Sequence, residues 1–259
     1  MPDHMQNQVF FFFVVVDIVD SMMRCMDKSE KSLQPHQVKF VRAFTQSRLR
    51  GALAIHKTGT GKTMLAVAAS MCYLTHYPDH SVVVITPASL LSGFRKELVG
   101  AYPSAEGDHR FKFYTYAGYA GNPCDCENSL MVIDESQAVK NVDGVAFKAV
   151  LKCSKRANKV LLLSATPIIN KAYDLEPLMS LIHGKNPVDE ASFNEILHSP
   201  KLARVYFGCR LSFFENDPKR AMKYFPAVKE MFFPITMNPG MEKIYKSLEG
   251  GRETAKITD

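Results

Sequence analysis

The sequence has no long apolar run, no basic start and no compositional bias. Its most apolar stretch, residues 9–16 (VFFFFVVV), is far shorter than the roughly 20 residues that a helix needs to cross a bilayer core. The chain starts with MPDH, without the basic residues that open a signal peptide. We therefore expect residues 9–16 to form a buried strand or an N-terminal extension packed on a domain. A membrane anchor is the less favoured alternative.

The composition excludes several classes of protein. Of 259 residues, 46% are hydrophobic and 22% are charged, which is ordinary for a globular protein and excludes a disordered or collagen-like chain. This length suits one large domain, or one domain with an appendage. The net charge of +6 is mildly basic. It is compatible with a polyanionic partner but does not require one.

The cysteines show no CxxC pair. They are Cys25, Cys72, Cys124, Cys126, Cys153 and Cys209. This pattern favours reduced thiols in an intracellular compartment. The Cys124 and Cys126 spacing lacks the second ligand pair that a zinc site requires, so we expect no metal there.

Short apolar runs alternate with helical patterns along the middle of the chain. The expected strands are residues 49–55, 82–86, 111–116, 130–134 and 159–164, and the expected helices are residues 63–77, 89–99, 142–154 and 173–183. Such alternation predicts a mostly parallel sheet with helices on both faces, which binds ligands beyond the carboxyl ends of its strands. Further along the chain we expect a loop at 118–128, helices at 191–197, 202–207 and 239–248, and a last strand at 228–237.

A glycine-rich turn follows the first expected strand. Residues 56–63 (HKTGTGKT) end in the Gly-Lys-Thr triplet of a phosphate-binding loop, although His56 stands where the strict pattern has glycine. Glycines let successive backbone N–H groups point at one phosphate group, and the following helix turns its positive end to the same place. Lys62 would reach the β- and γ-phosphates, and the Thr63 hydroxyl would bind Mg²⁺. The other candidate nucleotide-binding residues of the loop are Lys57, Thr58, Gly59, Thr60 and Gly61.

Two acids follow a buried strand, in residues 130–135 (LMVIDE). Carboxylates at the end of a buried strand are costly unless a cation or hydrogen bonds compensate them. Asp134 would hold Mg²⁺ through water, and Glu135 would orient and deprotonate an attacking water. The simpler alternative, a strand that ends in solvent, is disfavoured by the phosphate-binding loop upstream in the same sheet.

Five segments resemble, in order, the motifs of Swi/Snf-like ATPases within the superfamily 2 helicases. They are residues 33–40 (LQPHQVKF), 86–98 (TPASLLSGFRKEL), 113–116 (FYTY), 134–141 (DESQAVKN, a DEAH-like box) and 161–170 (LLLSATPIIN). The resemblance covers residues 33–248. In His56 and in the spelling of the SAT segment, the chain looks most like the helicase-like transcription ATPases of large DNA viruses. The implied fold is a three-layer α/β RecA-like P-loop NTPase lobe.

The resemblance also implies roles for individual residues. Gln37 would contact the adenine of ATP. Glu135 would be the catalytic base, acting with Lys62 and with Gln137, which replaces a histidine of the family and can hydrogen-bond in both directions. The residues expected to couple nucleotide state to nucleic-acid contacts are Ser164, Ala165 and Thr166. Those expected near the nucleic-acid backbone are Thr86, Pro87, Ala88 and Thr115.

A second lobe, which supplies arginine fingers in this family, has no counterpart in the sequence. Residues 228–248 resemble the passage towards it, and no Q-x-x-G-R-x-x-R segment follows. An arginine finger is worth about 10³–10⁵ in rate, so we expect this polypeptide alone to bind ATP and hydrolyse it slowly. The expected organisation is an N-terminal extension (1–32), an ATP-binding lobe (33–237) and the start of a linker (238–259).

The resulting functional hypothesis is a nucleic-acid-dependent ATP hydrolase that uses ATP and Mg²⁺. It would couple hydrolysis to translocation on double-stranded DNA in viral transcription. We expect a soluble protein with no membrane partner, inside a virion or in the cytoplasm or nucleus of an infected cell. The first alternative is a truncated nucleotide-binding module that assembles with, or regulates, a full helicase or a transcription complex. A P-loop kinase or other small NTPase would leave the DESQAVKN and SATP segments unexplained.

Overall fold

The computed structural model describes residues 25–216 and 238–255. The chain divides into two compact units, residues 1–216 and residues 217–259. In the second unit a helix, α11 (Pro239–Ala255), extends the one expected at 239–248. The apolar run 9–16 and the strand expected at 228–237 lie outside the described residues, and the domain boundaries stay a prediction. Among the helices of the described residues, none is long and apolar enough to cross a membrane.

The first unit is built on a six-stranded sheet in the order β3-β2-β4-β5-β1-β6, in which every neighbouring pair is parallel. Its strands are β1 (Gly51–His56), β2 (Ser81–Thr86), β3 (Phe111–Thr115), β4 (Ser129–Ile133), β5 (Lys159–Ser164) and β6 (Leu211–Phe214). The parallel sheet expected from the sequence is thereby confirmed. Because all strands run the same way, their carboxyl ends share one edge, where parallel sheets bind ligands.

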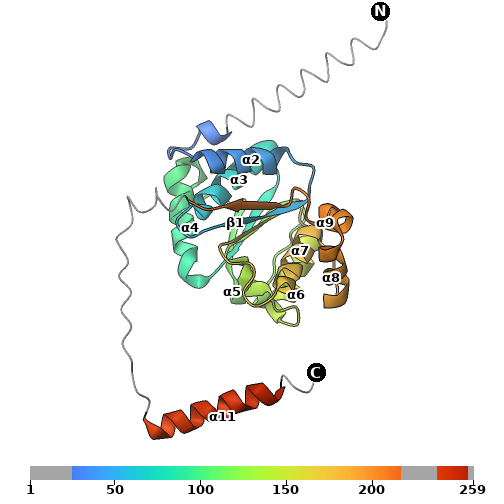
Figure 1. Cartoon of the computed structure of the whole chain (residues 1–259). Helices are drawn as coiled ribbons and strands as arrows, with labels where there is room; N and C mark the ends of the chain where they lie inside the picture. Colours follow the sequence, from blue (N-terminus) through green and yellow to red (C-terminus); the bar gives the residue numbers. More distant parts are fainter. Residues whose placement is uncertain (1–24, 217–237, 256–259) are drawn as a thin grey trace, which may run out of the picture. The chain divides into compact units, whose positions relative to one another are not determined.

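Helices cover both faces of this sheet (Figure 1). The helices α2 (Pro35–Gln46), α3 (Lys62–His76) and α4 (Ala88–Ala101) share one core with alternate strand residues such as Val82 and Val84. The helices α5 (Tyr116–Gly121), α6 (Val145–Arg156) and α7 (Glu176–His183) share the other core with Val83 and Ile85. These three layers confirm the predicted fold class.

Several elements differ from the expected ones. The helix α5 lies where a loop was expected at 118–128, because the Thr115 side chain caps its first turn by accepting a hydrogen bond from Gly118 N at 3.0 Å. The helix α2 and the edge strand β6 were not predicted. In β6 Phe213 is 66% exposed, so this strand lacks the continuous apolar run that marks the central ones. The helices expected at 191–197 and 202–207 are α8 (Glu190–His198) and α9 (Pro200–Phe207).

A buried lysine fixes the end of α2. Lys159, the first residue of β5, donates hydrogen bonds to the carbonyl oxygens of Phe44 (2.8 Å), Ser47 (2.6 Å) and Leu49 (3.2 Å). Burial lowers the pKa of this ammonium group to about 8. Three otherwise unpaired carbonyl groups at and beyond the helix end are satisfied in this way, and the position of α2 is tied to the middle of the sheet.

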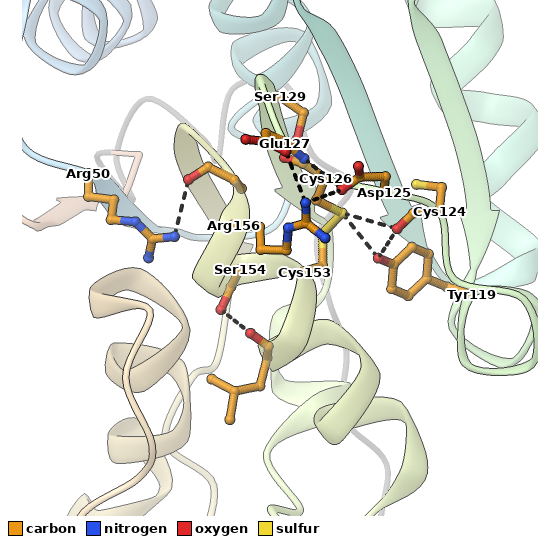
Figure 2. The surroundings of a disulfide bond; sticks show 12 residues. Arg50, Tyr119, Cys124, Asp125, Cys126, Glu127, Ser129, Cys153, Ser154 and Arg156 are labelled. Carbon is orange, nitrogen blue, oxygen red and sulfur yellow. Dashed lines mark hydrogen bonds and ion pairs between the residues drawn. A yellow bond between two sulfur atoms is a disulfide. The ribbon is translucent and has the colours of Figure 1, made fainter.

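Four of the six cysteines are paired, so the expectation of reduced thiols was wrong for them. Disulfides join Cys25 to Cys72 and Cys126 to Cys153, and Figure 2 shows the surroundings of the second bond. The partners lie 47 and 27 residues apart in the sequence. Pairing at such separations cannot be deduced from spacing alone.

Candidate active site

The glycine-rich loop between β1 and α3 has a conformation that only glycine adopts easily. Gly59 and Gly61 both have φ of 78°, in the left-handed region that other residues avoid. A Cβ atom on Gly61 would also clash with Nε2 of Gln37. Within the loop, the hydroxyl of Thr60 donates to the carbonyl oxygen of Lys57 at 2.6 Å. The result is a tight curl that leads directly into the first turn of α3.

The amino-terminal turn of α2 holds this loop from one side. Gln37 is 3% exposed, and its Nε2 donates to the carbonyl oxygen of Gly61 at 2.9 Å while its Oε1 accepts from the backbone N–H of Gln34 at 2.7 Å. Nε2 of His36 lies 3.0 Å from the carbonyl oxygen of Thr60. Since a carbonyl only accepts, this ring nitrogen carries the proton. The sequence pointed to Gln37 but gave His36 no role; the adenine contact of Gln37 stays a prediction.

His56, which replaces the first glycine of the strict loop pattern, is accommodated as a core residue. Its side chain is 1% exposed and its Nε2 lies 3.0 Å from Oγ of Ser212 in β6. Its ring contacts those of His36, Phe40 and Phe214. Burial, together with the nearby His36 and Lys62, lowers the pKa of His56 to about 4. A neutral ring therefore anchors the loop to the edge strand.

The two acids lie at the same edge of the sheet, beyond β4. The backbone N–H of Asp134 donates to Ile85 O in β2 at 2.9 Å, which continues the sheet by one residue. The Asp134 side chain is 4% exposed, and its carboxylate accepts from Glu135 N at 3.1 Å and from the Thr86 hydroxyl at 3.5 Å. Burial and the charge of Glu135 raise the pKa of Asp134, and the charge of Lys62 acts in the opposite direction. The charge of Lys62 therefore acts on Asp134, although β5 lies between β1, which precedes the loop with Lys62, and β4, which precedes the acids.

A chain of hydrogen bonds links the second acid to the SAT segment. Glu135 adopts a left-handed conformation with φ of 52°, which is uncommon for a residue other than glycine. Nε2 of Gln137 donates to Oε2 of Glu135 at 2.6 Å, and Oε1 of Gln137 accepts from the Ser164 hydroxyl at 2.6 Å. Oγ of Ser164 in turn accepts from the backbone N–H of Thr166 at 3.1 Å. Gln137 therefore hydrogen-bonds in both directions, to Glu135 and to Ser164, and its catalytic role stays a prediction.

A second bridge joins the same two segments farther out. Oδ2 of Asp174 accepts hydrogen bonds from the backbone N–H groups of Ile169 (2.9 Å) and Asn170 (2.8 Å) and from the ammonium group of Lys140 (3.0 Å). The bond from Asn170, followed by those from Ile169 and Lys140, lowers the pKa of Asp174 to about 2. The loop after β4 and the loop after β5 are thus fixed to each other twice.

One further residue of the site was missed in the sequence. The hydroxyl of Tyr116 donates to the carbonyl oxygens of Asp134 (2.5 Å) and Glu135 (3.1 Å). Burial, then the charges of the two acids, raises the pKa of Tyr116. Tyr116 therefore holds the backbone on which both carboxylates stand. No sequence signal distinguished it from the neighbouring Tyr114 and Tyr119.

The residues expected near nucleic acid lie along the edge formed by β2 and β3. Thr86 is fully buried, with its hydroxyl directed at Asp134, and the Thr115 side chain caps α5. Pro87 is half-buried and Ala88 is exposed at the start of α4. Contact with a nucleic-acid backbone stays a prediction. Because the Thr86 hydroxyl is directed at Asp134, the protein groups available for such a contact are the main chain of this segment and Ala88.

The donors at this edge fit a phosphate chain with Mg²⁺. Within residues 25–216 the side chains of Lys62 and Thr63 make no hydrogen bond or ion pair, so both are free for a ligand. The carboxylate of Asp134, although buried, has no ion-pair partner in the same range. Mg²⁺ prefers oxygen ligands such as a carboxylate and a hydroxyl, and a buried carboxylate is stabilised by a cation.

Two family models match the sequence. One, described as the SNF2-related domain, matches residues 122–258, and the other, described as the res subunit of type III restriction enzymes, matches residues 30–114. Together they cover both the segment with the glycine-rich loop and the segment with the two acids.

Two viral proteins are similar to this chain in sequence. A protein named as an ATP-dependent RNA helicase in Acanthamoeba polyphaga mimivirus is 26% identical over 172 residues, which is 64% of this chain and 36% of that protein. Another, in Heliothis virescens ascovirus 3e, is 26% identical over 245 residues, which is 82% of this chain and 26% of that protein. The chain thus spans about a third of the length of the first viral relative and about a quarter of the length of the second.

Solved structures share the fold. The SWI2/SNF2 ATPase core of Sulfolobus solfataricus in complex with double-stranded DNA superposes with a TM-score of 0.62 at 20% identity, over 77% of this chain and 48% of that one. A second structure, of the SWI2/SNF2 ATPase core domain of Sulfolobus solfataricus, gives a TM-score of 0.61 at 20% identity, over 77% of this chain and 46% of that one.

Proposed function

The chain belongs to the SNF2-related domain family of superfamily 2 helicases, and on this premise we propose that it binds ATP with Mg²⁺ and hydrolyses it in response to nucleic acid. The observation that carries the proposal is that Lys62 and Thr63, whose side chains make no hydrogen bond or ion pair among the described residues, lie at the same edge of the sheet as the buried carboxylate of Asp134. In this arrangement the curled loop binds the phosphates through its backbone N–H groups.

Each polar group at the edge has a distinct task in this proposal. Lys62 would bind the β- and γ-phosphates, and Thr63 and Asp134 would hold Mg²⁺. The cation, when bound, neutralises charge that develops on the phosphate oxygens. Tyr116 keeps the strand end in place under both carboxylates. These residues bind and orient; they do not exchange protons with the substrate.

Glu135 takes the proton of the attacking water. Its Oε2 is held by Gln137, which leaves the other carboxylate oxygen to accept a proton. Because Gln137 is also held by Ser164, a movement of the SAT segment shifts Glu135. This linkage supports a role of Ser164, Ala165 and Thr166 in coupling nucleotide state to nucleic-acid binding.

The finer features of the proposal rest on relatives. The Sulfolobus solfataricus core in complex with double-stranded DNA supports double-stranded DNA as the nucleic acid. Translocation as the output is proposed from the resemblance of the motifs. The viral relatives, which are named as ATP-dependent RNA helicases, support a viral setting. A place in viral transcription, inside a virion or an infected cell, is part of the proposal and rests on the resemblance of the motifs. Arginine fingers supplied by a second lobe would raise the rate by about 10³–10⁵, so the 259-residue chain alone should bind ATP and turn it over slowly.

A binding titration combined with single-turnover hydrolysis tests the core of the proposal. Wild type, Lys62→Ala and Glu135→Gln are titrated with a fluorescent ATP analogue and Mg²⁺, and hydrolysis is then followed with enzyme in excess over ATP. Loss of the lysine should weaken binding by at least about tenfold, whereas Glu135→Gln should bind normally and lose hydrolysis. Unchanged affinity in Lys62→Ala would refute the site.

The alternative function, a nucleotide-binding module that regulates a full helicase or a transcription complex, rests on the same site. Stoichiometric ATP binding, no single-turnover hydrolysis with any nucleic acid, and co-purification with a helicase would favour it. Hydrolysis stimulated by double-stranded DNA would favour the motor lobe.

A further inference from the structure

The edge strand β6 contacts the glycine-rich loop and its supports at three points. The backbone N–H of Lys57, at the start of the loop, donates to the carbonyl oxygen of Phe214 at 3.0 Å. Nε2 of His56 lies 3.0 Å from Oγ of Ser212. The ring of Phe214 stacks on that of His36, with the ring centroids 3.6 Å apart and the planes 4° from parallel. The strand thus reaches the loop although it carries none of the motifs assigned to ATP binding.

The stacked pair fixes the direction in which His36 points. Phe214 covers one face of the imidazole ring, and the ring of His56 meets it at 61°, with the centroids 5.7 Å apart. In this orientation Nε2 of His36 donates to the carbonyl oxygen of Thr60, 3.0 Å away. Thr60 is 4% exposed, which leaves little room for a water molecule to replace this donor. Loss of the Phe214 ring would let the imidazole turn away from the loop.

The bond to Thr60 also sets the direction of the next N–H group. In a planar, trans peptide the carbonyl oxygen and the following N–H point in opposite directions. Because the carbonyl oxygen of Thr60 is held against α2, the N–H of Gly61 points away from α2. The proposed function assigns such N–H groups of the curled loop to the phosphates of ATP. The Phe214 ring is therefore connected, through one imidazole and one peptide unit, to a phosphate-binding donor.

We infer that Phe214 is a positioning residue for ATP binding, which holds the peptide between Thr60 and Gly61 in its phosphate-binding orientation through the ring of His36. This role rests on the proposed function of the loop. Its effect falls on the affinity for ATP rather than on the rate of hydrolysis, because Glu135 is held through the SAT segment and not through β6. The edge strand thereby becomes part of the nucleotide site.

The neighbouring Phe213 provides a matched comparison within the same strand. Its side chain is 66% exposed and makes no ring contact among the described residues. Phe213→Leu therefore removes a phenyl ring from β6 without changing the stack on His36. Phe214→Tyr is the conservative variant, because it keeps a six-membered aromatic ring against the imidazole.

The experiment measures ATP affinity and the rate of hydrolysis separately on the full chain. Each variant is titrated with a fluorescent ATP analogue and Mg²⁺, and single-turnover hydrolysis is then followed at protein concentrations that bind all of the ATP. Phe214→Leu should weaken binding about two- to tenfold, the effect of losing one aromatic pair, while the single-turnover rate stays within about twofold of wild type. Phe214→Tyr and Phe213→Leu should bind ATP as wild type does.

A double-mutant cycle with His36 tests the connection itself. His36→Phe keeps an aromatic ring beside Phe214 but has no donor for the carbonyl oxygen of Thr60, so it should weaken ATP binding to a similar extent. Once that bond is gone, Phe214→Leu should add no further loss, and the two effects should not be additive. Additive effects would mean that the two residues act independently, contrary to the inferred connection.

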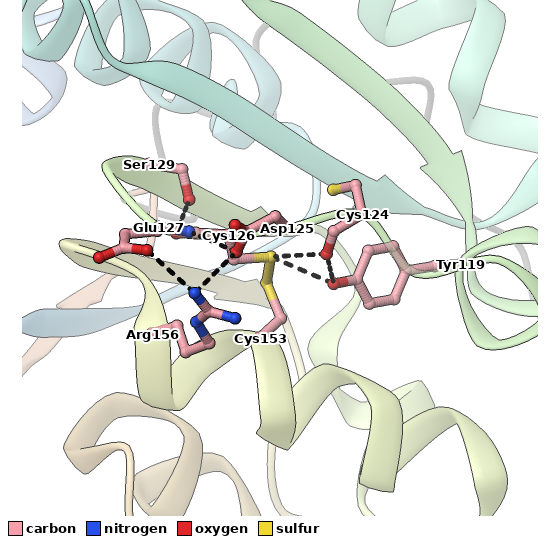
Figure 3. Close-up of polar contacts among 8 residues, drawn as sticks. All are labelled: Tyr119, Cys124, Asp125, Cys126, Glu127, Ser129, Cys153 and Arg156. Atoms are coloured by element: carbon pink, nitrogen blue, oxygen red, sulfur yellow. Dashed lines mark hydrogen bonds and ion pairs between the residues drawn. A yellow bond between two sulfur atoms is a disulfide. The ribbon is translucent and has the colours of Figure 1, made fainter.

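A contact in the other layer controls for a general loss of stability. The Tyr119 hydroxyl lies 3.1 Å from Sγ of Cys126 and 3.4 Å from the carbonyl oxygen of Cys124 (Figure 3). Tyr119→Phe removes these contacts without touching the loop, so it should lower the melting temperature and leave ATP affinity unchanged. If ATP affinity simply followed the melting temperature across all variants, a positioning role of Phe214 would be excluded.

The remaining outcomes separate this role from the proposed function. Wild-type affinity in Phe214→Leu, or an equal loss in Phe213→Leu, would overturn the role of Phe214, whereas weaker binding by Lys62→Ala would still support the ATP site. If wild type itself bound no ATP, both would be refuted.

Discussion

Replacing Asp174 by asparagine should loosen the outer bridge of the site. In wild type a single carboxylate oxygen accepts from two backbone N–H groups and from Lys140, and the side chain is 11% exposed. Asparagine keeps one acceptor oxygen but loses the charge that attracts all three donors. Among the described residues, the hydrogen-bonded link that remains between the loops after β4 and β5 would be the one through Gln137 and Ser164.

The lowered pKa sets the magnitude. The native interactions reduce the pKa of Asp174 from 3.8 to about 2, and at about 1.36 kcal/mol per pKa unit this corresponds to about 2 kcal/mol of unfolding free energy at neutral pH. Because the folded-state pKa is below the unfolded one, this stabilisation is present above pH 3.8 and is lost as the pH falls through about 2. At pH 3, about half of it should remain.

Urea unfolding of wild type and Asp174→Asn at pH 7 and pH 3 provides the assay. We expect the difference between the two proteins to be about 2 kcal/mol at pH 7 and about half of that at pH 3. Asp79→Asn is the control, since Asp79 is exposed and makes no hydrogen bond or ion pair within the described residues. A difference that is the same at both pH values, or no larger than that of the control, would refute the reasoning.

Three further predictions concern Gln137, Lys159 and His56. Gln137→Ala should slow single-turnover hydrolysis roughly 10- to 100-fold, as expected when a catalytic group shifts by about 1 Å, with unchanged ATP affinity; equal hydrolysis rates would contradict the link to Glu135. Lys159→Met should cost about 2–3 kcal/mol in urea unfolding, because three carbonyl groups lose their donor, whereas the exposed Lys148→Met should be neutral. The pKa of His56 is 6.5 in the unfolded chain and about 4 in the folded protein. On acidification the unfolded chain therefore takes up a proton first, and wild type loses stability as the pH falls from 6.5 towards 4. In thermal melts at pH 7 and pH 5, the drop in melting temperature should be smaller for His56→Gln than for wild type.

The central strands and the two site loops were predictable because each carries a strong local signal. Strands β2, β4 and β5 are continuous apolar runs, as expected for strands covered on both faces. The parallel order then places the loop with Lys62 and the loop with Asp134 at one edge, so their proximity follows from topology. The chemical roles of these residues stay a prediction.

The contacts that complete the site depend on residues far apart in the sequence. The hydrogen bonds of Tyr116 to Asp134 O and of Lys140 to Asp174 join segments that are far apart in the sequence. No rule of residue spacing predicts such bonds. His36 was passed over for the same reason, because its partner Thr60 lies 24 residues away. The edge strand β6 escaped notice since it is short and half-exposed, and its strand character comes from pairing with β1 rather than from its own pattern.

The strand β5 has an engineering consequence through the residues at its two ends. Lys159 at its start caps α2, and Ser164 at its end contacts Gln137, while every residue between them is buried. Adding or deleting one residue in this strand would turn its side chains to the opposite layers and would detach one of the two end contacts. Insertions for labels or permuted termini therefore belong in exposed turns such as the one at Gly107, and β5 should keep its native length.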